Sequence, residues 1–214
     1  NGETAKIENG AMVYMQDVTL EGKLNSNKKG LGGFLSAMAK SIVSDESIFI
    51  THVTGTTPDG VVAIAPSVPG KIAKLEVGAR QYRLNDGAFF ACDDSVNYKM
   101  QKQDLSQAFF GGSGGLFVME TEGQGDLLVS TFGDLVTLEC TPDRPVSIDN
   151  EHVVAWDSTL NYSIEVASGT FGFTTGEGLV NKFTGSGKIL IQTRNLHSLA
   201  DAINPFLPDK NDGD

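Results

Sequence analysis

Short apolar runs separated by turn residues dominate the chain. The runs are about four to seven residues long, are rich in Val, Ile, Leu and Phe, and end at Gly, Pro, Asp or Asn. Runs of this composition and length are typical of β-strands. Seven of them are predicted to be strands: 47–53, 61–65, 71–77, 116–120, 127–131, 153–156 and 188–193. Their spacing favours an all-β protein with a sandwich, barrel or β-helix architecture.

Two stretches have helical spacing instead. Between Leu31 and Ile42 the apolar side chains recur at intervals of three and four residues, which places them on one face of a helix. The same spacing occurs in residues 196–204, and Pro205 is expected to end that helix. Both are predicted to be short helices that pack against the sheets.

One block of sequence occurs three times. Its first part is a turn followed by an apolar strand, at residues 9–15, 86–92 and 150–156. Its second part is an apolar strand that leads to a glycine turn, at Gly55, Gly123 and Gly185. In this alignment Trp156 takes the position of Met15 and Cys92, and it is predicted to fill the core.

The repeated block predicts one domain over residues 1–208. We expect three tandem β repeats, at 1–77, 78–143 and 144–208, followed by a disordered acidic tail at 209–214. A tandem β unit leaves a hydrophobic face or a sheet edge that its neighbour covers, so a threefold repeat also favours ring-like assembly.

Composition and charge exclude several classes of protein. The 214 residues carry 16 Lys and Arg against 27 Asp and Glu, a formal net charge of -11, and the basic residues do not cluster. Non-specific nucleic-acid binding depends on clustered Lys and Arg, so no nucleic-acid partner is expected. No apolar run approaches the roughly 20 residues of a membrane-spanning helix, so no membrane insertion is expected.

Cys92 and Cys140 have no CxxC spacing and fit reduced thiols in a β core, and a cytoplasmic location is expected.

The sequence contains no strong candidate for a catalytic group. Residues 111–115 satisfy the G-x-S-x-G pattern of a nucleophile elbow around Ser113, but a strand follows where that motif requires a helix. Three acidic pairs, Asp93-Asp94, Asp45-Glu46 and Glu120 with Glu122, lie at turns where carboxylates are usually solvated. We therefore predict no catalytic residues, with a hydrolase that uses Ser113 as a weak alternative.

A metal or cofactor is not expected either. His52, His152 and His197 fall in different parts of the repeat, and none has a second His or Cys at ligand spacing. The glycine-rich stretch at 111–115 lacks the Lys-Ser/Thr pair of a phosphate-binding loop. Residues present in one repeat only are better candidates for a site, so a small ligand bound between repeats or subunits is predicted to contact His152, Trp156 and Arg194.

Several motifs together resemble a known family. They are Gly10-Ala11-Met12-Val13, Ala63-Ile64-Ala65-Pro66-Ser67-Val68-Pro69-Gly70, Phe109-Phe110-Gly111-Gly112, His152-Val153-Val154-Ala155-Trp156, Gly176-Glu177-Gly178-Leu179-Val180, Phe183-Thr184-Gly185-Ser186-Gly187 and Leu190-Ile191-Gln192-Thr193-Arg194-Asn195-Leu196. In combination they resemble the altered-inheritance-of-mitochondria family of conserved bacterial and mitochondrial proteins, over nearly the whole chain to about Pro208. The resemblance implies three units with the β fold of the trp RNA-binding attenuation protein, of double-stranded β-helix type, and a homotrimeric ring. It brings no catalytic residues, and it does not carry over tryptophan or RNA binding.

The residues and the resemblance lead to one expectation about function. The triplicated β unit and the lack of a complete catalytic constellation favour a non-enzymatic oligomeric scaffold or interaction module with an unidentified protein partner. A small-ligand-binding protein is the alternative.

Overall fold

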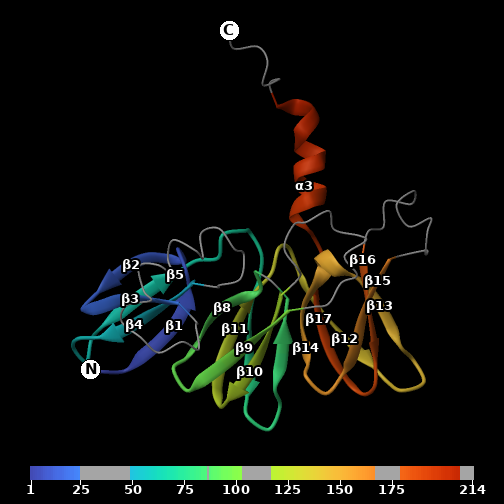
Figure 1. The fold of residues 1–214 in the computed structure, drawn as a ribbon. Helices are drawn as coiled ribbons and strands as arrows, with labels where there is room; N and C mark the ends of the chain where they lie inside the picture. Colours follow the sequence, from blue (N-terminus) through green and yellow to red (C-terminus); the bar gives the residue numbers. More distant parts are fainter. Residues whose placement is uncertain (25–48, 86, 103–116, 167–178, 208–214) are drawn as a thin grey trace.

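The computed structural model describes residues 1–24, 49–85, 87–102, 117–166 and 179–207. In this part of the chain there are seventeen strands, the α-helix α3 and two short 3-10 helices, so the all-β prediction is confirmed (Figure 1). The seven predicted strands are all present within a few residues of their predicted bounds. The predicted second helix is also present, whereas the helix expected at 31–42 and the tail at 209–214 lie outside the described residues.

For description we group the strands by their order along the chain into three consecutive sets, called units 1, 2 and 3. Unit 1 contains β1 (Thr4–Glu8), β2 (Met12–Gln16), β3 (Val18–Leu24), β4 (Phe49–Gly55), β5 (Val61–Ile64) and β6 (Ile72–Val77). Unit 2 contains β7 (Tyr82–Leu84), β8 (Phe89–Asp93), β9 (Val96–Lys102), β10 (Phe117–Gly123), β11 (Gly125–Ser130) and β12 (Leu135–Cys140). Unit 3 contains β13 (Val146–Asp149), η2 (Asn150–His152), β14 (Val153–Asp157), β15 (Asn161–Val166), β16 (Leu179–Thr184), β17 (Gly187–Gln192), α3 (Leu196–Ile203) and η4 (Asn204–Phe206).

The same antiparallel pairings occur in every unit. The third strand pairs with the fourth and the fourth with the first, giving the orders β3-β4-β1, β9-β10-β7 and β15-β16-β13. The second strand pairs with the fifth, as β2-β5, β8-β11 and β14-β17. Each unit therefore contains a three-stranded part and a two-stranded part.

Neighbouring units are joined by further strand pairing. The first and sixth strands of unit 1, β1 and β6, flank the β8-β11 pair of unit 2 and complete the sheet β3-β4-β1-β8-β11-β6. In the same way β7 and β12 flank the β14-β17 pair of unit 3. The units consequently lie side by side in chain order, with unit 1 at one end of the row and unit 3 at the other (Figure 1).

The two ends of the row hold incomplete sheets. At the unit 1 end, β2 and β5 form a sheet of only two strands, and at the unit 3 end β13, β16 and β15 form a sheet of three. The chain position that holds a sixth strand in units 1 and 2 holds α3 in unit 3, and α3 projects away from the sheets (Figure 1).

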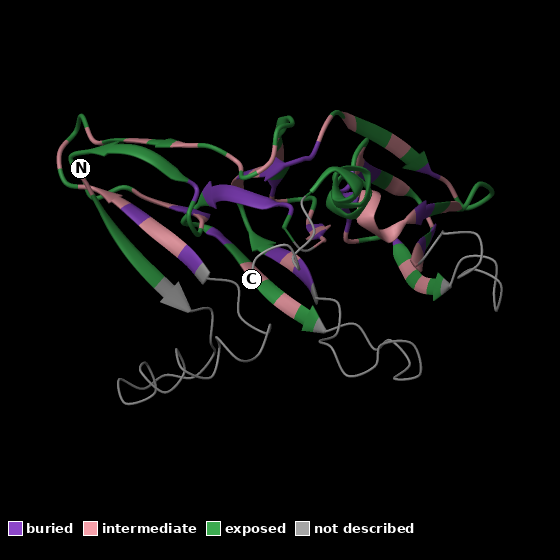
Figure 2. Cartoon of the chain, turned by 90° about the horizontal axis from the view of Figure 1, so that it is seen from above, coloured by how far each residue is buried: buried purple, intermediate pink, exposed green. Residues whose placement is uncertain are grey.

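The core lies at the junctions between units. Trp156 of β14 is completely buried, with its ring centroid 5.5 Å from that of Phe183 and 5.0 Å from that of Tyr162. The same cluster includes Val118 and Cys140, which belong to unit 2. β8 and β14, which have a neighbouring strand on both sides, are almost entirely buried, and Figure 2 shows the buried segments of the chain in purple. The predicted core position of Trp156 is confirmed, and Cys92 and Cys140 are buried free thiols as expected.

Candidate functional site

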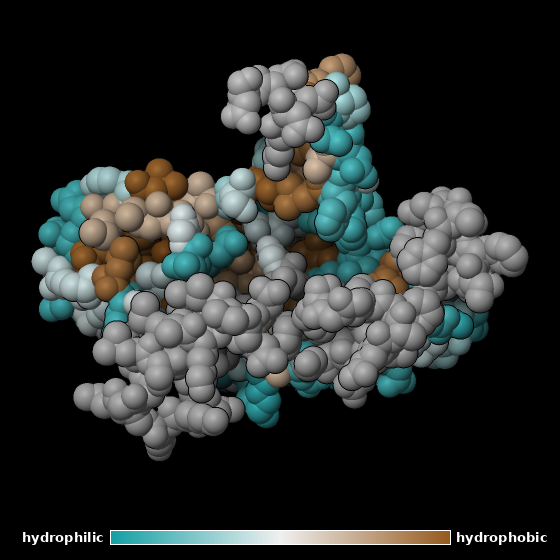
Figure 3. All heavy atoms as spheres, turned by 45° about the horizontal axis from the view of Figure 1, so that its top comes forward, coloured by the Kyte–Doolittle hydropathy of each residue, from teal (hydrophilic) through white to brown (hydrophobic). Residues whose placement is uncertain are grey.

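The exposed face of β2 is the first unusual feature of the surface. All five residues of β2 are exposed, although Met12, Val13, Tyr14 and Met15 are apolar or aromatic. The equivalent strands are covered: all five residues of β14 and the first four of β8 are buried. Figure 3 shows the apolar surface at the unit 1 end of the molecule. A contiguous apolar patch of this kind usually marks an interaction surface.

The reason for the difference lies in strand pairing. β8 is paired with β1, and β14 is paired with β7, so each is covered by the first strand of the preceding unit. Among the described strands, none takes this place beside β2, and none pairs with the outer edge of β13. Among the described strands, β2 and β13 are therefore open edges of the two kinds that pair with each other at both internal junctions.

At each internal junction a basic side chain donates hydrogen bonds to the backbone of the next unit. Lys6 of β1 is buried, and its Nζ donates hydrogen bonds to the carbonyl oxygens of Asp94 (2.7 Å) and Val96 (2.8 Å) in unit 2. Arg83, at the equivalent position of β7, donates to the carbonyl oxygen of Leu160 at 3.1 Å in unit 3. The equivalent residue of β13 is Ser147, so the open edge of unit 3 has a neutral side chain at this point.

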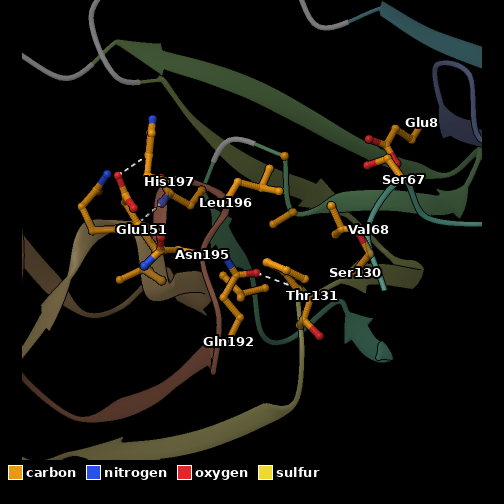
Figure 4. A pocket seen from close by; sticks show the side chains of 17 residues that line it. Glu8, Ser67, Val68, Ser130, Thr131, Glu151, Gln192, Asn195, Leu196 and His197 are labelled. Atoms are coloured by element: carbon orange, nitrogen blue, oxygen red, sulfur yellow. Dashed lines mark hydrogen bonds and ion pairs between the residues drawn. The ribbon is translucent and has the colours of Figure 1, made fainter. Parts of the chain in front are cut away.

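The second feature is a cavity of about 420 Å³ at the base of α3. It is lined by residues of all three units: Glu8, Ser67 and Val68 of unit 1, Asn85, Gly87, Ala88, Ser130, Thr131 and Phe132 of unit 2, and Asn150, Glu151, Val153, Val154, Gln192, Asn195, Leu196 and His197 of unit 3. Figure 4 shows Glu8 and Ser67 on one side of the cavity and Glu151 and His197 on the other. Its volume lies in the range of small-molecule sites.

Hydrogen bonds fix the α3 side of this cavity. The Asn195 side chain caps the helix, because its Oδ1 accepts a hydrogen bond from the Ser198 backbone N–H at 2.7 Å. The Asn195 amide in turn donates to His152 Nε2 at 3.1 Å, and His152 Nδ1 donates to the Gln192 carbonyl oxygen at 2.7 Å. In these contacts Nδ1 is the donor and Nε2 the acceptor of the His152 ring. The base of α3 is further held by an ion pair between His197 and Glu151 at 2.5 Å.

Of the two acidic residues that line the cavity, Glu8 and Glu151, Glu8 has the fewer side-chain contacts. Among the described residues its carboxylate has no hydrogen-bond or ion-pair partner, while its backbone belongs to the end of β1. Burial raises the pKa of the Glu8 carboxyl above its ordinary value. No pattern in the sequence pointed to this residue, because a Glu at a strand end is usually solvated.

The three predicted ligand contacts lie in different surroundings. His152 supports the helix cap, Trp156 is enclosed in the core, and Arg194 lies beside Gly133 with its backbone N–H bonded to the Phe132 carbonyl oxygen. None of the three is part of the cavity wall formed by the described residues. Ligand contact by these residues stays a prediction.

The candidate catalytic carboxylates are engaged in structural contacts. Asp93 accepts a hydrogen bond from the Asp126 backbone N–H, and Asp94 forms an ion pair with Lys6 at 3.7 Å. Glu120 pairs with Arg83 at 2.7 Å, and Glu122 pairs with Lys99. Ser113 and the pair Asp45-Glu46 lie outside the described residues. Among the residues that are described, no group of three or more His, Cys, Asp or Glu is arranged to hold a metal ion.

Comparison with known proteins assigns the chain to a family. A family profile described as "Mitochondrial biogenesis AIM24" matches residues 1–194. The chain belongs to the AIM24 family. The resemblance inferred from the sequence motifs is therefore confirmed.

The AIM24 family relatives include proteins of Streptococcus pyogenes. An uncharacterised protein of serotype M6 is 46% identical over 212 residues, which cover 97% of this chain and 84% of that protein. An X-ray crystal structure of a S. pyogenes protein matches with a TM-score of 0.78 and 44% identity, covering 97% of this chain and 91% of the other. The described part of the present chain contains no helix long and apolar enough to cross a membrane.

Proposed function

We propose that this AIM24 family protein is a non-enzymatic scaffold that assembles head to tail with copies of itself. The observation that carries the proposal is the exposure of β2. Met15 of β2 is 46% exposed, whereas Cys92 and Trp156 at the equivalent positions are 5% and 0% exposed. A second copy that supplies β13 beside β2 would cover this strand as β1 covers β8 and β7 covers β14.

The internal junctions define the register of this contact. Lys6 lies opposite Cys92 at the first junction, and Arg83 lies opposite Trp156 at the second. The repeat places Ser147 at the position of Lys6 and Arg83, and Met15 at the position of Cys92 and Trp156. In the proposed contact, Met15 of one copy therefore lies opposite Ser147 of the next.

A head-to-tail contact uses two different surfaces of each chain, so it closes into a ring or grows into a filament. We propose a closed ring of three chains, as the family resemblance implies. Closure would pair β13 with β2 at every contact and would present three copies of every surface to a protein partner. Edges left unpaired would be a template for aggregation, which gives a physical reason for closure.

The assembly state of two substituted proteins tests the proposal. Met15→Asp places a charge where the neighbouring copy would bury an apolar side chain, so it should convert the oligomer to monomers in native mass spectrometry. Val136→Asp is the matched control, because Val136 is 39% exposed on β12, outside the proposed contact. A wild-type protein that is monomeric at micromolar concentration, or an oligomer that survives Met15→Asp, would exclude this interface.

The non-enzymatic part of the proposal has its own test. The residue that would act as the nucleophile of a hydrolase is Ser113. A fluorophosphonate probe should leave the assembled protein unlabelled, and covalent labelling at Ser113 would overturn this part of the proposal while leaving the assembly intact.

A further inference from the structure

The cavity at the base of α3 has a mainly apolar interior. Val68, Phe132, Val153 and Leu196 contribute apolar side chains to its wall. Leu196 is also the first residue of the exposed apolar face of α3, so the lining continues onto the surface of the helix. An apolar body of roughly ten to twenty non-hydrogen atoms would fit a space of this size.

The polar groups of the wall are mostly used by the protein itself. Gln192 accepts from the Phe132 N–H and donates to the Glu151 carbonyl oxygen, each at 2.9 Å, and the Asn195 side chain caps α3. The Asn85 amide donates to the Asn150 carbonyl oxygen at 2.9 Å. These groups shape the cavity, and they are not free to recognise a ligand through the same atoms.

The charged groups of the wall differ in their surroundings. Glu151 is paired with His197, whereas Glu8 has no hydrogen-bond or ion-pair partner among the described residues. The described wall contains no Lys or Arg. A partly desolvated carboxylate without a partner is stabilised by an added positive charge and is destabilised by an added negative one.

We propose that this cavity binds a small organic cation, an ammonium group attached to an apolar body, with the ammonium group at Glu8 and the body between Leu196 and Val68. The cavity is built within one chain, so the site does not depend on assembly. It also differs from the predicted contacts of His152, Trp156 and Arg194. A carboxylate or phosphate ligand is disfavoured, because the described wall has negative side chains and no Lys or Arg to offset its charge.

Three probes with the same tail separate charge from apolar contact: octylammonium, octanol and octanoate. Isothermal titration calorimetry on the full-length protein at pH 7.5 should give binding in that order, with octylammonium at least about tenfold tighter than octanoate. Chemical shift changes at Ala88, Val154 and Leu196 would place the ligand in this cavity. Binding of octanoate equal to or tighter than that of octylammonium, or no binding of any probe at millimolar concentration, would overturn the proposal.

Substitution of Glu8 tests the assigned role of its charge. Glu8→Gln keeps the size of the side chain, so it should weaken octylammonium binding about fivefold to tenfold and leave octanol binding unchanged. Glu139→Gln is the matched control, since Glu139 is an exposed carboxylate on β12 outside the cavity. Equal weakening of both probes by Glu8→Gln would show a loss of cavity shape instead of charge recognition and would contradict the assignment. Thermal unfolding of each variant verifies that it is folded.

Discussion

Met15 and Trp156 occupy the same position in the second strands of units 1 and 3, yet Met15 is half-exposed and Trp156 is completely buried. The difference is not one of local conformation, because both residues lie in strands that pair with the fifth strand of their own unit. It results from the neighbouring unit: β7 covers β14, and no described strand covers β2. The position of a unit in the row therefore decides which surface is core and which is interface.

Removal of the Trp156 side chain should strongly destabilise the fold. Trp156→Ala leaves a large cavity against Phe183 and Tyr162, so the free energy of unfolding should fall by about 3–5 kcal/mol in urea denaturation. Val136→Ala truncates an exposed side chain and should change it by less than about 0.5 kcal/mol. Similar effects of the two substitutions would contradict the assigned core.

The cap of α3 should control the local stability of the helix. Asn195→Ala removes the acceptor for the Ser198 N–H, and the loss of such a cap costs about 1 kcal/mol. Amides of residues 196–203 should then exchange faster with deuterium, while the sheets keep their protection. Asn195→Asp retains the cap acceptor but loses the donor to His152, so its exchange rates should lie between those of the wild type and Asn195→Ala. Unchanged exchange in Asn195→Ala would show that the cap does not hold the helix.

The Cys92 thiol should make stability depend on alkaline pH. Burial raises the pKa of this thiol to about 12 in the folded protein, against 9.0 when it is solvated. The group's contribution to stability is therefore complete below pH 9 and is lost as the pH rises from 9 towards 12, because only the unfolded chain releases the proton easily. Urea denaturation from pH 8 to 11 should show this decline, and Cys92→Ala should reduce it. An equally steep decline in Cys92→Ala would assign the effect to other groups.

The turn between β10 and β11 should require glycine at position 123. Gly123 has a φ of +91°, and a Cβ atom there would lie 2.4 Å from the Ser95 carbonyl oxygen. Gly123→Ala should lower the free energy of unfolding by about 1–3 kcal/mol. Gly78→Ala is the control, because the nearest atom to its added Cβ would be 4.0 Å away, and the change should be below about 0.5 kcal/mol. An equal response at the two glycines would contradict the strained turn.

The sequence predicted the elements whose pattern is local. The apolar runs of β5, β6 and β14 and the helical spacing of α3 were recognisable, since each pattern lies within one short segment. The strand β9 was missed, because its alternation includes Lys99 and Gln101 and resembles a polar loop. The alignment of Met15, Cys92 and Trp156 was also visible in the sequence.

Features that depend on contacts between units could not be predicted. Exposure of Met15 requires knowledge of which strand lies next to β2, and the cavity combines Glu8 with Leu196, which are almost a whole chain apart. The role of His152 depends on the position of Asn195 at the start of α3, although an Asn before a helical pattern is itself a recognisable cap signal.

Disulfide trapping between copies tests the central claim most directly. With Met15→Cys and Ser147→Cys in one chain, mild oxidation should give covalently linked dimers and trimers on a non-reducing gel, because these residues would lie opposite each other across the contact. The buried native thiols Cys92 and Cys140 should remain unreactive. Met15→Cys with Asp149→Cys is the control, in which the cysteines lie two residues out of register and should link poorly. Linking in the control pair alone, or none in either pair, would contradict head-to-tail assembly through β2 and β13 in this register.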